Sequence, residues 1–509
     1  MQAAIAPQPP YDQGLKLASA GRHFEAIECF EKALALSPLD TKVLFALGNT
    51  ASALGQPVLA RQFYFRVLEL EPGRIEALVN LANLLRAEGQ FAAARSLLEP
   101  ALARCPDSPE LQLTLGSAWR EEGDNDRAAA CYRAALAVRP NYAPALSNLA
   151  DLLADDGDIE RARTLYGQAI KAEPGNAQAR LNRAILHLLT GNLKDGWRDY
   201  SARLDVPGKV PSIAKPEQRL AAWSGGSLKK IRLLVRSEQG VGDQIMFASL
   251  FGELADRAAV EGGSVLIECE SRLVSLFGRS FPNATIRPAE LKNVSGKTTA
   301  DYGWLKSAGG ANAAIAMGSL PRYLRKDIAA FPADHAYLKP DIGELVRWHG
   351  VFAGLGASPV IGICWRSGKS GGHRAVQYAP LAAWAEFIKT LPGVLVSTQY
   401  DAGAEEIAEL ERLSGRRIFV PPGLDQKNEL DRTCAMLSAL DILVSAPTAV
   451  SWLGAAAGTA TLKVLYAVSW TGFGECFEPF APSCKLVMPQ SRGDWASAFT
   501  KAHEIIAQL

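Results

Sequence analysis

A proline returns every 34 residues through the first third of the chain, and this period constrains the fold more than any other feature. The prolines are Pro38, Pro72, Pro106, Pro140 and Pro174. A small residue precedes each proline by 24 positions, at Gly14, Gly48, Ala82, Gly116 and Ala150. An alanine precedes each by 12 positions, at Ala26, Ala60, Ala94, Ala128 and Ala162. A large side chain follows that alanine by one helical turn, at Phe30, Tyr64, Leu98, Tyr132 and Tyr166. The period predicts a stack of repeated helical units.

This pattern resembles the tetratricopeptide repeat, in which each unit is a pair of antiparallel helices. The small residues let the two helices approach, the large side chain is expected to fill the gap between neighbouring pairs, and the proline ends the second helix. Five repeats are predicted over residues 7–174, and an atypical sixth begins near Asn176. In the sixth, Gly196 replaces the alanine, and Trp197 with Tyr200 is expected to dock on the following domain. The sequence therefore predicts an all-α solenoid over residues 1–204.

Solenoids of this kind hold other polypeptides in a groove, and asparagines at related places on the first helices suggest how. They are Asn49, Asn80, Asn83, Asn148 and Asn182. An amide offers both a donor and an acceptor to a bound peptide backbone, so we expect these five residues to bind a protein acceptor. The alternative is that they are exposed polar residues without a binding role.

Composition limits the kinds of partner and the cellular compartment that we expect for this chain. The chain has 509 residues and a formal net charge of +1, which gives no broad electrostatic reason to expect nucleic acid or an anionic membrane as a partner. Eight cysteines without a C-x-x-C pair favour reduced thiols. The first residues lack a basic start followed by an apolar core, and no stretch approaches ~20 uncharged apolar residues. We expect a cytoplasmic protein with no membrane span.

The second half of the chain alternates short apolar runs with helical patterns. Residues 205–229 are rich in proline and polar residues and are expected to be a linker. Residues 230–340 and 341–509 are each expected to form a Rossmann-like, doubly wound α/β domain. Strands are predicted at 231–235, 264–269, 313–317, 360–365, 394–397, 417–420, 442–445 and 461–465, and helices include 244–260, 273–281 and 495–508. Ligands bind such sheets outside the carboxyl ends of the strands, so both domains are expected to face one cleft.

The turn after the first of these strands, residues 238–243, is the first candidate site. Gly240 and Gly242 permit close backbone approach, and the helix that follows has an N-terminus that attracts anions. Asp243 could act there as a general base toward an acceptor hydroxyl. The alternative is that Asp243 only caps the helix beside it.

Two later turns have the residues of a phosphate site. Arg366, Lys369 and Arg374 lie on a glycine-containing loop that follows a strand, a combination that suits a phosphate ester or diphosphate. A solvated basic loop is the alternative. Thr448 and Ser451 open a helix after another strand, where they could hold a phosphate or simply cap the helix.

Other chemistries have little support in the sequence. The six histidines are isolated, so no metal site is expected. No serine lies in a G-x-S-x-G turn, which argues against a hydrolase of that type.

Over nearly its whole length the chain resembles a bacterial group in which tetratricopeptide repeats are fused to a GT-B glycosyltransferase domain. That domain is related to ADP-heptose heptosyltransferases and, more distantly, to O-linked N-acetylglucosamine transferases. The motifs that carry the resemblance are Gly196-Trp197 with Tyr200, Trp223-Ser-Gly-Gly, 238–243, Ser319-Leu320-Pro321, Gly362-Ile363-Cys364-Trp365, Asp441-Ile442, Gln490 and Gly493-Asp494-Trp495. The resemblance implies a metal-independent enzyme without a bound cofactor, with Asp243 as the base. It also implies that the 366–369 loop and the Thr448 turn hold the phosphates of a nucleotide-sugar donor.

One departure alters the implied donor pocket. Relatives usually have Asp-Thr followed by a histidine where this chain has Pro447-Thr448 and Trp452. A similar arrangement occurs in alphaproteobacterial enzymes that modify flagellin with nonulosonic acids, such as pseudaminic acid carried on CMP. The resemblance thus predicts a protein O-glycosyltransferase with flagellin as its acceptor and Arg366, Lys369 and Arg374 facing an acidic donor. Two alternatives stay open: a heptosyltransferase-like enzyme acting on a glycan or lipid carrier, and a catalytically degenerate scaffold.

Overall fold

The chain forms two compact units that divide between Ala179 and Arg180. The computed structural model describes residues 9–208, 210–213, 219–294, 297–332, 336–356, 358–368 and 377–508. The division falls inside helix α11 (Ala177–Leu189), so most of the sixth repeat belongs to the second unit. The sequence instead placed the end of the solenoid at residue 204. Within the described ranges, no helix combines the length and the apolar character needed to cross a membrane.

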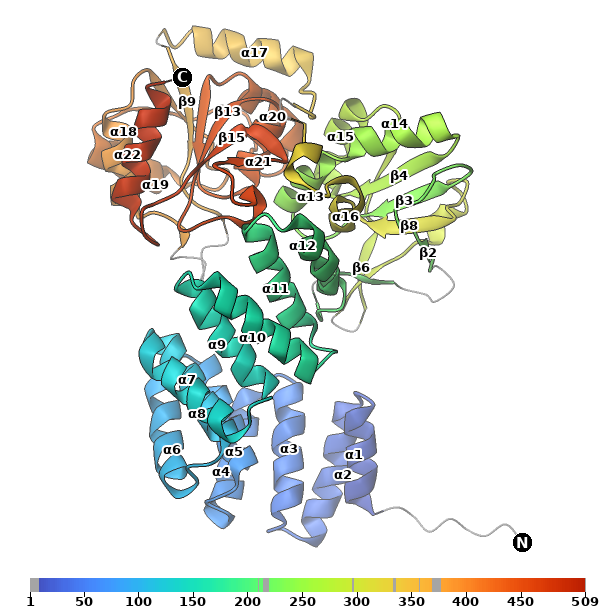
Figure 1. Cartoon of the computed structure of the whole chain (residues 1–509), viewed down its shortest axis with the longest axis vertical. Coiled ribbons are helices and arrows are strands. Elements are labelled where there is room, and N and C mark those ends of the chain that lie inside the picture. Colours follow the sequence, from blue (N-terminus) through green and yellow to red (C-terminus); the bar gives the residue numbers. More distant parts are fainter. Residues whose placement is uncertain are drawn as a thin grey trace. The chain divides into compact units, whose positions relative to one another are not determined.

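The first unit consists of helical pairs, as the 34-residue period predicts (Figure 1). The helices are α1 (Pro10–Ser19), α2 (His23–Leu36), α3 (Thr41–Ala53), α4 (Pro57–Leu70), α5 (Ile75–Ala87), α6 (Phe91–Arg104), α7 (Pro109–Glu122), α8 (Asn125–Val138), α9 (Ala143–Asp155) and α10 (Ile159–Ala172). Each recurring proline lies just beyond the second helix of its pair. These helices form five pairs, and the predicted all-α character of the unit is confirmed.

Where the small residue of the repeat is glycine, it faces the large side chain of the same repeat. A Cβ atom added to Gly48 would lie 2.6 Å from the ring of Tyr64, and one added to Gly116 would lie 2.7 Å from Tyr132. Both tyrosines are buried. In these repeats the large side chain therefore fills the space between the two helices of its own pair. The sequence had predicted a position between neighbouring pairs instead.

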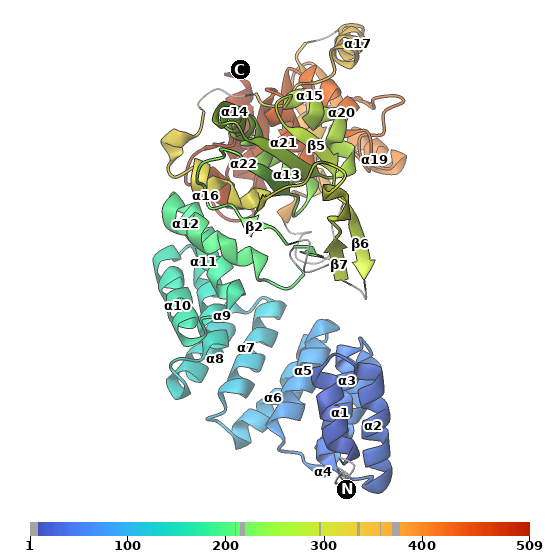
Figure 2. The same cartoon turned by 90° about the vertical axis from the view of Figure 1, so that its right-hand side faces the viewer.

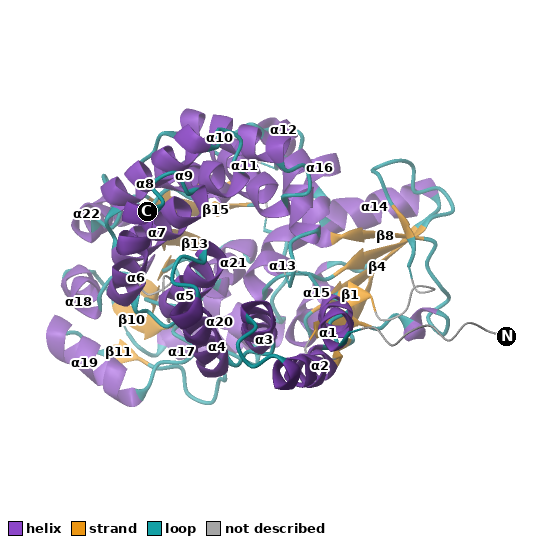
Figure 3. Ribbon diagram, turned by 90° about the horizontal axis from the view of Figure 1, so that it is seen from below, coloured by secondary structure: helices purple, strands orange, loops and turns teal. Residues whose placement is uncertain are grey.

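The second unit contains two large, mainly parallel sheets and a smaller three-stranded sheet, and Figure 3 draws the strands in orange and the helices in purple. The first sheet has the order β2-β8-β3-β4-β5, with all neighbours parallel. Its strands are β2 (Ala221–Ala222), β3 (Arg232–Arg236), β4 (Ser264–Cys269), β5 (Thr285–Pro288) and β8 (Ala313–Ala316). The helices between them are α13 (Val241–Ala248), α14 (Phe251–Glu261) and α15 (Val274–Ser280). The strand order reverses between β3 and β8, which is where such sheets bind ligands.

The second sheet has the order β11-β10-β9-β12-β13-β15-β14. Its strands are β9 (Val360–Cys364), β10 (Val394–Ser397), β11 (Ile418–Phe419), β12 (Ile442–Ser445), β13 (Ala460–Val464), β14 (Phe477–Glu478) and β15 (Ala481–Val487). The first six positions follow the 3-2-1-4-5-6 order of doubly wound sheets, and only the edge strand β14 is antiparallel. The reversal lies between β9 and β12.

Helices cover the second sheet. They are α17 (Ile342–Ala353), α18 (Leu381–Lys389), α19 (Ala404–Ser414), α20 (Leu430–Ser438), α21 (Ala449–Ala456) and α22 (Trp495–Ile506). Side chains of α18, α19 and α22 share one apolar core with the strands, including Trp384, Leu410 and Phe499. Helix α21 packs on β12, β13 and β15. The predicted α/β character of this region is confirmed.

Two parts of the second unit differ from the prediction. The expected linker 205–229 includes β2 and β1 (Ser212–Ile213), and β1 pairs with β7 (Lys297–Ala300), which pairs with β6 (Leu291–Val294). Figure 2 shows β6 and β7 as a ribbon beside the first sheet. Two-residue strands carry almost no period-2 signal, so sequence patterns miss them. The single helix predicted at 244–260 is divided into α13 and α14.

Candidate functional site

A cavity of about 910 Å³ opens in the second unit, at the carboxyl ends of strands from both sheets. From the first sheet come the turn after β3 and Arg272, which follows β4. From the second come residues that follow β9, β10, β11 and β12, together with part of β13. Both strand-order reversals therefore contribute to one cavity, as doubly wound topology predicts.

Four of the predicted site residues line this cavity together. They are Gly240, Gly242, Asp243 and Thr448. They come from two turns that lie about 200 residues apart in the chain and meet because each follows a strand beside a reversal point.

Asp243 both lines the cavity and caps α13. Its Oδ2 accepts a hydrogen bond from the backbone N–H of Gly240 at 3.1 Å. The carboxylate is three residues into the helix, where the N-terminal dipole stabilises negative charge. The capping interaction that was the alternative interpretation is thus present, and it leaves the carboxylate on the cavity wall.

Gly242 allows the two α/β halves to approach. A Cβ atom on it would lie 3.4 Å from Cα of Ala449 and 3.5 Å from the ring of Trp452, both on α21. Helices α13 and α21 are therefore in contact, and the contact brings Asp243 beside the turn that opens α21. The glycine is needed here for packing as well as for access to the cavity.

The glycine turn is held in place by the sixth repeat. Arg203, which lies just after α12 (Leu193–Tyr200), donates through Nε and Nη2 to the carboxylate of Glu238 at 2.9 and 2.6 Å, and both side chains are buried. Gln239 donates from Nε2 to the hydroxyl of Tyr200 at 3.2 Å. Gln239 has a φ of 62°, in the left-handed region, so the turn keeps a strained conformation that these contacts stabilise.

The predicted docking role of Trp197 and Tyr200 agrees with these contacts inside the second unit. Trp197 donates from Nε1 to the carbonyl oxygen of Arg325 at 3.0 Å. Its ring packs edge-on against Trp470, Phe473 and Phe480. The last repeat is thereby joined to both α/β halves through one aromatic cluster.

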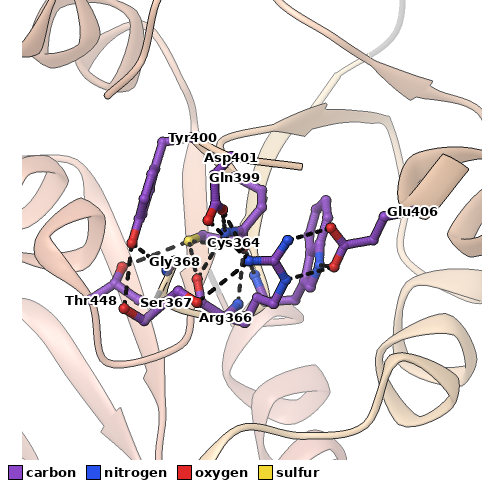
Figure 4. A network of polar contacts seen from close by, with 10 residues as sticks. Cys364, Arg366, Ser367, Gly368, Gln399, Tyr400, Asp401, Glu406 and Thr448 are labelled. Carbon is purple, nitrogen blue, oxygen red and sulfur yellow. Dashed lines mark hydrogen bonds and ion pairs between the residues drawn. The ribbon is translucent and has the colours of Figure 1, made fainter. Parts of the chain in front are cut away.

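Arg366 points to carboxylates of its own half (Figure 4). Its Nε donates to Glu406 at 2.7 Å, and Nη1 donates to Asp401 at 3.1 Å. The bond to Glu406, with the charges of both carboxylates, raises the pKa of Arg366. Arg366 is not among the described residues that line the cavity, whereas its neighbour Ser367 is. Two anions already neutralise this cation.

The rest of the basic loop and the α21 turn complete the predicted set. Lys369 and Arg374 lie outside the described residues. Thr448 accepts from the N–H of Val450 at 3.2 Å and caps α21. Ser451 is fully buried and donates to the carbonyl oxygen of Thr448 at 2.8 Å, so its hydroxyl serves the helix rather than the cavity.

The sequence interpretation missed a buried ion pair in the cavity wall. Lys463 of β13 donates to Oε1 of Glu478 at 2.7 Å, and its Nζ lies 3.6 Å from the ring centroid of Trp452. Thr471, which also lines the cavity, donates to the same Glu478 oxygen at 2.8 Å. A lysine inside an otherwise apolar strand was the available signal, because a buried lysine needs a partner.

Two further cations, Arg272 and Lys427, line the cavity and were also missed. Arg272 is paired with Glu270 and donates from Nη1 to the backbone carbonyl of Lys427 at 2.6 Å, which links the two halves. Lys427 is exposed and has no ion-pair partner among the described residues. Within the same described ranges, no group of three acidic, histidine or cysteine side chains is arranged to hold a metal ion.

Three asparagines of the repeats, Asn49, Asn80 and Asn148, bond to neighbouring helices. Asn80 donates to Oδ1 of Asn49 at 2.8 Å, and Asn148 donates to Ser117 at 3.3 Å, so each links one repeat to the next. Asn83 accepts from Arg86 at 2.6 Å. Asn182 lies in the second unit. These contacts use part of the hydrogen-bonding capacity of the amides. The predicted role of the five residues in binding a protein acceptor stays a prediction.

Comparison with known proteins identifies the class of the first unit. Models of the tetratricopeptide repeat match residues 11–75, 75–118, 120–167 and 147–198. The first unit is therefore a tetratricopeptide-repeat solenoid, followed in this chain by an α/β unit.

One curated relative extends beyond the repeats. Protein FlbA of Caulobacter vibrioides is 30% identical over 314 residues, which are 62% of this chain and 52% of FlbA. The chain thus spans about half the length of that relative. Among solved structures, a thermophilic repeat protein of Thermus thermophilus matches 36% of this chain and 98% of its own at 26% identity, with a TM-score of 0.32. PilF of Pseudomonas aeruginosa matches 39% of this chain and 88% of its own at 20% identity, with a TM-score of 0.33.

Proposed function

We propose that this protein is an O-glycosyltransferase of GT-B type that transfers a sugar from a nucleotide donor to serine or threonine hydroxyls of a protein acceptor. The observation that carries the proposal is the cavity at the carboxyl ends of two doubly wound sheets, with Asp243 on its wall. GT-B enzymes consist of two such domains around one cleft. The proposal therefore rests on a similarity in both the arrangement of the sheets and the position of the cavity.

Each part of the cavity suits one part of that reaction. Asp243, as a carboxylate on the wall, accepts the proton of the attacking hydroxyl. The N-terminus of α21 and the ammonium of Lys427 stabilise the phosphate charge that develops on the leaving nucleotide. Arg366 contributes indirectly, because its pairs with Glu406 and Asp401 fix the start of the loop that follows β9.

The solenoid supplies the acceptor in this proposal. Tetratricopeptide repeats bind other polypeptides, and amides on the first helices could hydrogen-bond to an extended backbone. Flagellin is the proposed acceptor, and a nonulosonic acid such as pseudaminic acid, carried on CMP, is the proposed donor sugar. The exposed cation of Lys427 supports an acidic donor.

A scaffold that has lost transfer activity is the second candidate. It is favoured by the two carboxylates that neutralise Arg366 and by the capping role of Asp243. Saturable binding of a nucleotide sugar, followed by its turnover, would exclude this candidate.

The test is the intact mass of candidate acceptors from cells with and without this chain. A transferase gives a mass difference equal to one or more sugar residues, and that difference identifies both the acceptor and the sugar class. Acceptors of identical mass in both strains, together with no turnover of any CMP-, UDP- or ADP-sugar by the purified chain, would contradict the proposal.

A further inference from the structure

Gln426 is a buried amide on the cavity wall whose oxygen has no partner. The side chain is 8% exposed and lines the cavity. Its Nε2 donates to the backbone carbonyl of Ser397, the last residue of β10, at 3.0 Å. Its Oε1 has no hydrogen-bond partner among the residues the structure describes. An unsatisfied buried acceptor is costly, so a ligand that donates to it gains affinity.

The orientation of this amide follows from its partner. A backbone carbonyl can only accept, so the NH₂ end of Gln426 must face Ser397 and the oxygen must face elsewhere. The backbone of Gln426 is fixed as well. Asp425 accepts from the N–H groups of Lys427 and Asn428 at 3.1 and 3.0 Å, and Thr433 donates to the carbonyl of Gln426 at 3.3 Å. Gln426 therefore presents a pre-oriented acceptor, and only an acceptor, to a ligand.

The position of Gln426 indicates which part of a nucleotide sugar it meets. The transferred sugar must lie near Asp243, whose turn packs on Ala449 and Trp452 of α21. The wall on that side has the Lys463–Glu478 pair and the hydroxyl of Thr471. The sheet order separates β10, beside Gln426, from β13 by three strand spacings, which is roughly 14 Å. Gln426 is thus on the β10 side of the cavity, away from the Lys463 wall, and this is the side on which we place the nucleobase.

We infer that Gln426 reads the nucleobase of the donor and selects a base that bears an exocyclic amino group. The inference rests on the proposed function, because it assumes that the cavity takes a nucleotide. An amino group donates to Oε1 of Gln426, whereas the carbonyl oxygen of the deaminated base would place a second acceptor against it. Tyr400 and Leu430 also line the cavity and offer apolar contacts to the rings of the base.

The experiment measures the affinity of the full chain for matched nucleotides by calorimetry: CMP against UMP, AMP against IMP and GMP against XMP. We expect an amino-bearing nucleotide to bind about ten- to a hundredfold more tightly than its deaminated counterpart. Equal affinities within every pair would overturn the inference while leaving nucleotide binding, and with it the proposed function, in place. No saturable binding of any of these nucleotides would overturn both.

A variant then tests whether Gln426 is the cause. Gln426→Met keeps the length of the side chain but lacks the oxygen, and we expect it to bind both members of the pair with the weaker affinity. Gln490→Met, a change at an exposed residue outside the cavity, serves as the matched control and should discriminate as the natural chain does. Unchanged discrimination by a folded Gln426→Met variant would overturn the inference. If that variant does not fold, the comparison of paired nucleotides on the natural chain still tests the inference.

Discussion

The two units differ in how far along the chain their defining contacts reach. In the solenoid, Gly48 meets Tyr64 of the same repeat, and Asn49 meets Asn80 of the next, 31 residues on. In the α/β unit, the cavity joins Asp243 to a turn that includes Thr448, and Arg203 reaches Ser319 across 116 residues. Local contacts repeat with the sequence and can be counted from it, whereas the cavity depends on strand order. Four substitutions test this contrast, from the largest expected effect to the smallest.

Asp243→Asn tests the catalytic side of the comparison. Asparagine can still accept from the N–H of Gly240, so the helix cap is kept while the basic carboxylate is lost. If Asp243 is the base, transfer falls about 10²- to 10⁴-fold with nucleotide affinity little changed. The measurement is the initial rate of sugar transfer beside a binding isotherm.

The control for that variant is Asp494→Asn. Asp494 also caps a helix through its side chain: as the N-cap residue of α22 it accepts from the N–H of Ser497 at 3.1 Å, and it is not among the residues that line the cavity. Its variant should transfer sugar at the natural rate. A natural rate in Asp243→Asn would refute the base assignment and favour the scaffold candidate.

Arg203→Leu tests whether the sixth repeat is part of the second unit. The variant leaves Glu238 buried without its cation, which is expected to cost about 3–5 kcal/mol. Hydrogen exchange of the full chain should show faster exchange in residues 193–208 and 232–250 and no change in residues 10–172. The control Arg198→Leu removes an exposed pair with Asp195 and a longer contact with Asp199, which keeps its closer pair with Arg183, so its effect should be about 0–1 kcal/mol. Equal loss of protection in the first unit would mean that the two units unfold together.

Glu268→Gln tests an ionisable group of the second unit. Burial raises the pKa of Glu268 in β4 to about 7, although Tyr302 and Arg236 oppose the shift. The folded state therefore holds a proton that the unfolded state has released, and stability falls as the pH rises from about 4.5 to about 7, by about 3 kcal/mol in total. Below that range both states are protonated, and no cost remains.

The measurement is denaturant unfolding of the second unit at pH 5 and pH 8. The natural chain should be less stable at pH 8, and Glu268→Gln should remove most of that difference. Glu504→Gln, at an exposed position of α22, should leave the difference intact. A natural chain that is equally stable at both pH values would contradict the prediction.

Gly48→Ala tests the local side of the comparison and has the smallest expected effect. The new Cβ would lie 2.6 Å from the ring of Tyr64, and such overpacking costs about 1–3 kcal/mol. Adding Tyr64→Leu reproduces the alanine and leucine that stand at Ala82 and Leu98, so the double variant should regain part of the loss. Gly73→Ala has open space around it and should be neutral. The measurement is the midpoint of unfolding of the first unit. A Gly48→Ala variant as stable as the natural chain would show that the ring of Tyr64 moves aside at little cost.

The candidate site was predictable in part. The glycine turn and the Thr448 turn could be found because each follows a recognisable strand, and they do line one cavity. The neutralisation of Arg366 was not predictable, since Glu406 lies 40 residues away on a helix with many acidic side chains. Lys463 and Glu478 were missed for a similar reason: their pairing depends on where β13 and β14 lie in the sheet. The expected linker hid β1 and β2, because two residues are too few to show a period.

The sequence by itself determined the solenoid, because helical repeats make their main contacts with sequence neighbours and the same residue types return every 34 positions. It also determined that the second half alternates strands with helices. Only the tertiary structure decided that most of the sixth repeat belongs to the α/β unit and that Asp243 meets α21 through Gly242. It also decided that Gln426 donates to Ser397 and leaves its own oxygen without a partner among the described residues. Contacts of this second kind join distant segments through the order of parallel strands, which hydrophobic periodicity does not encode.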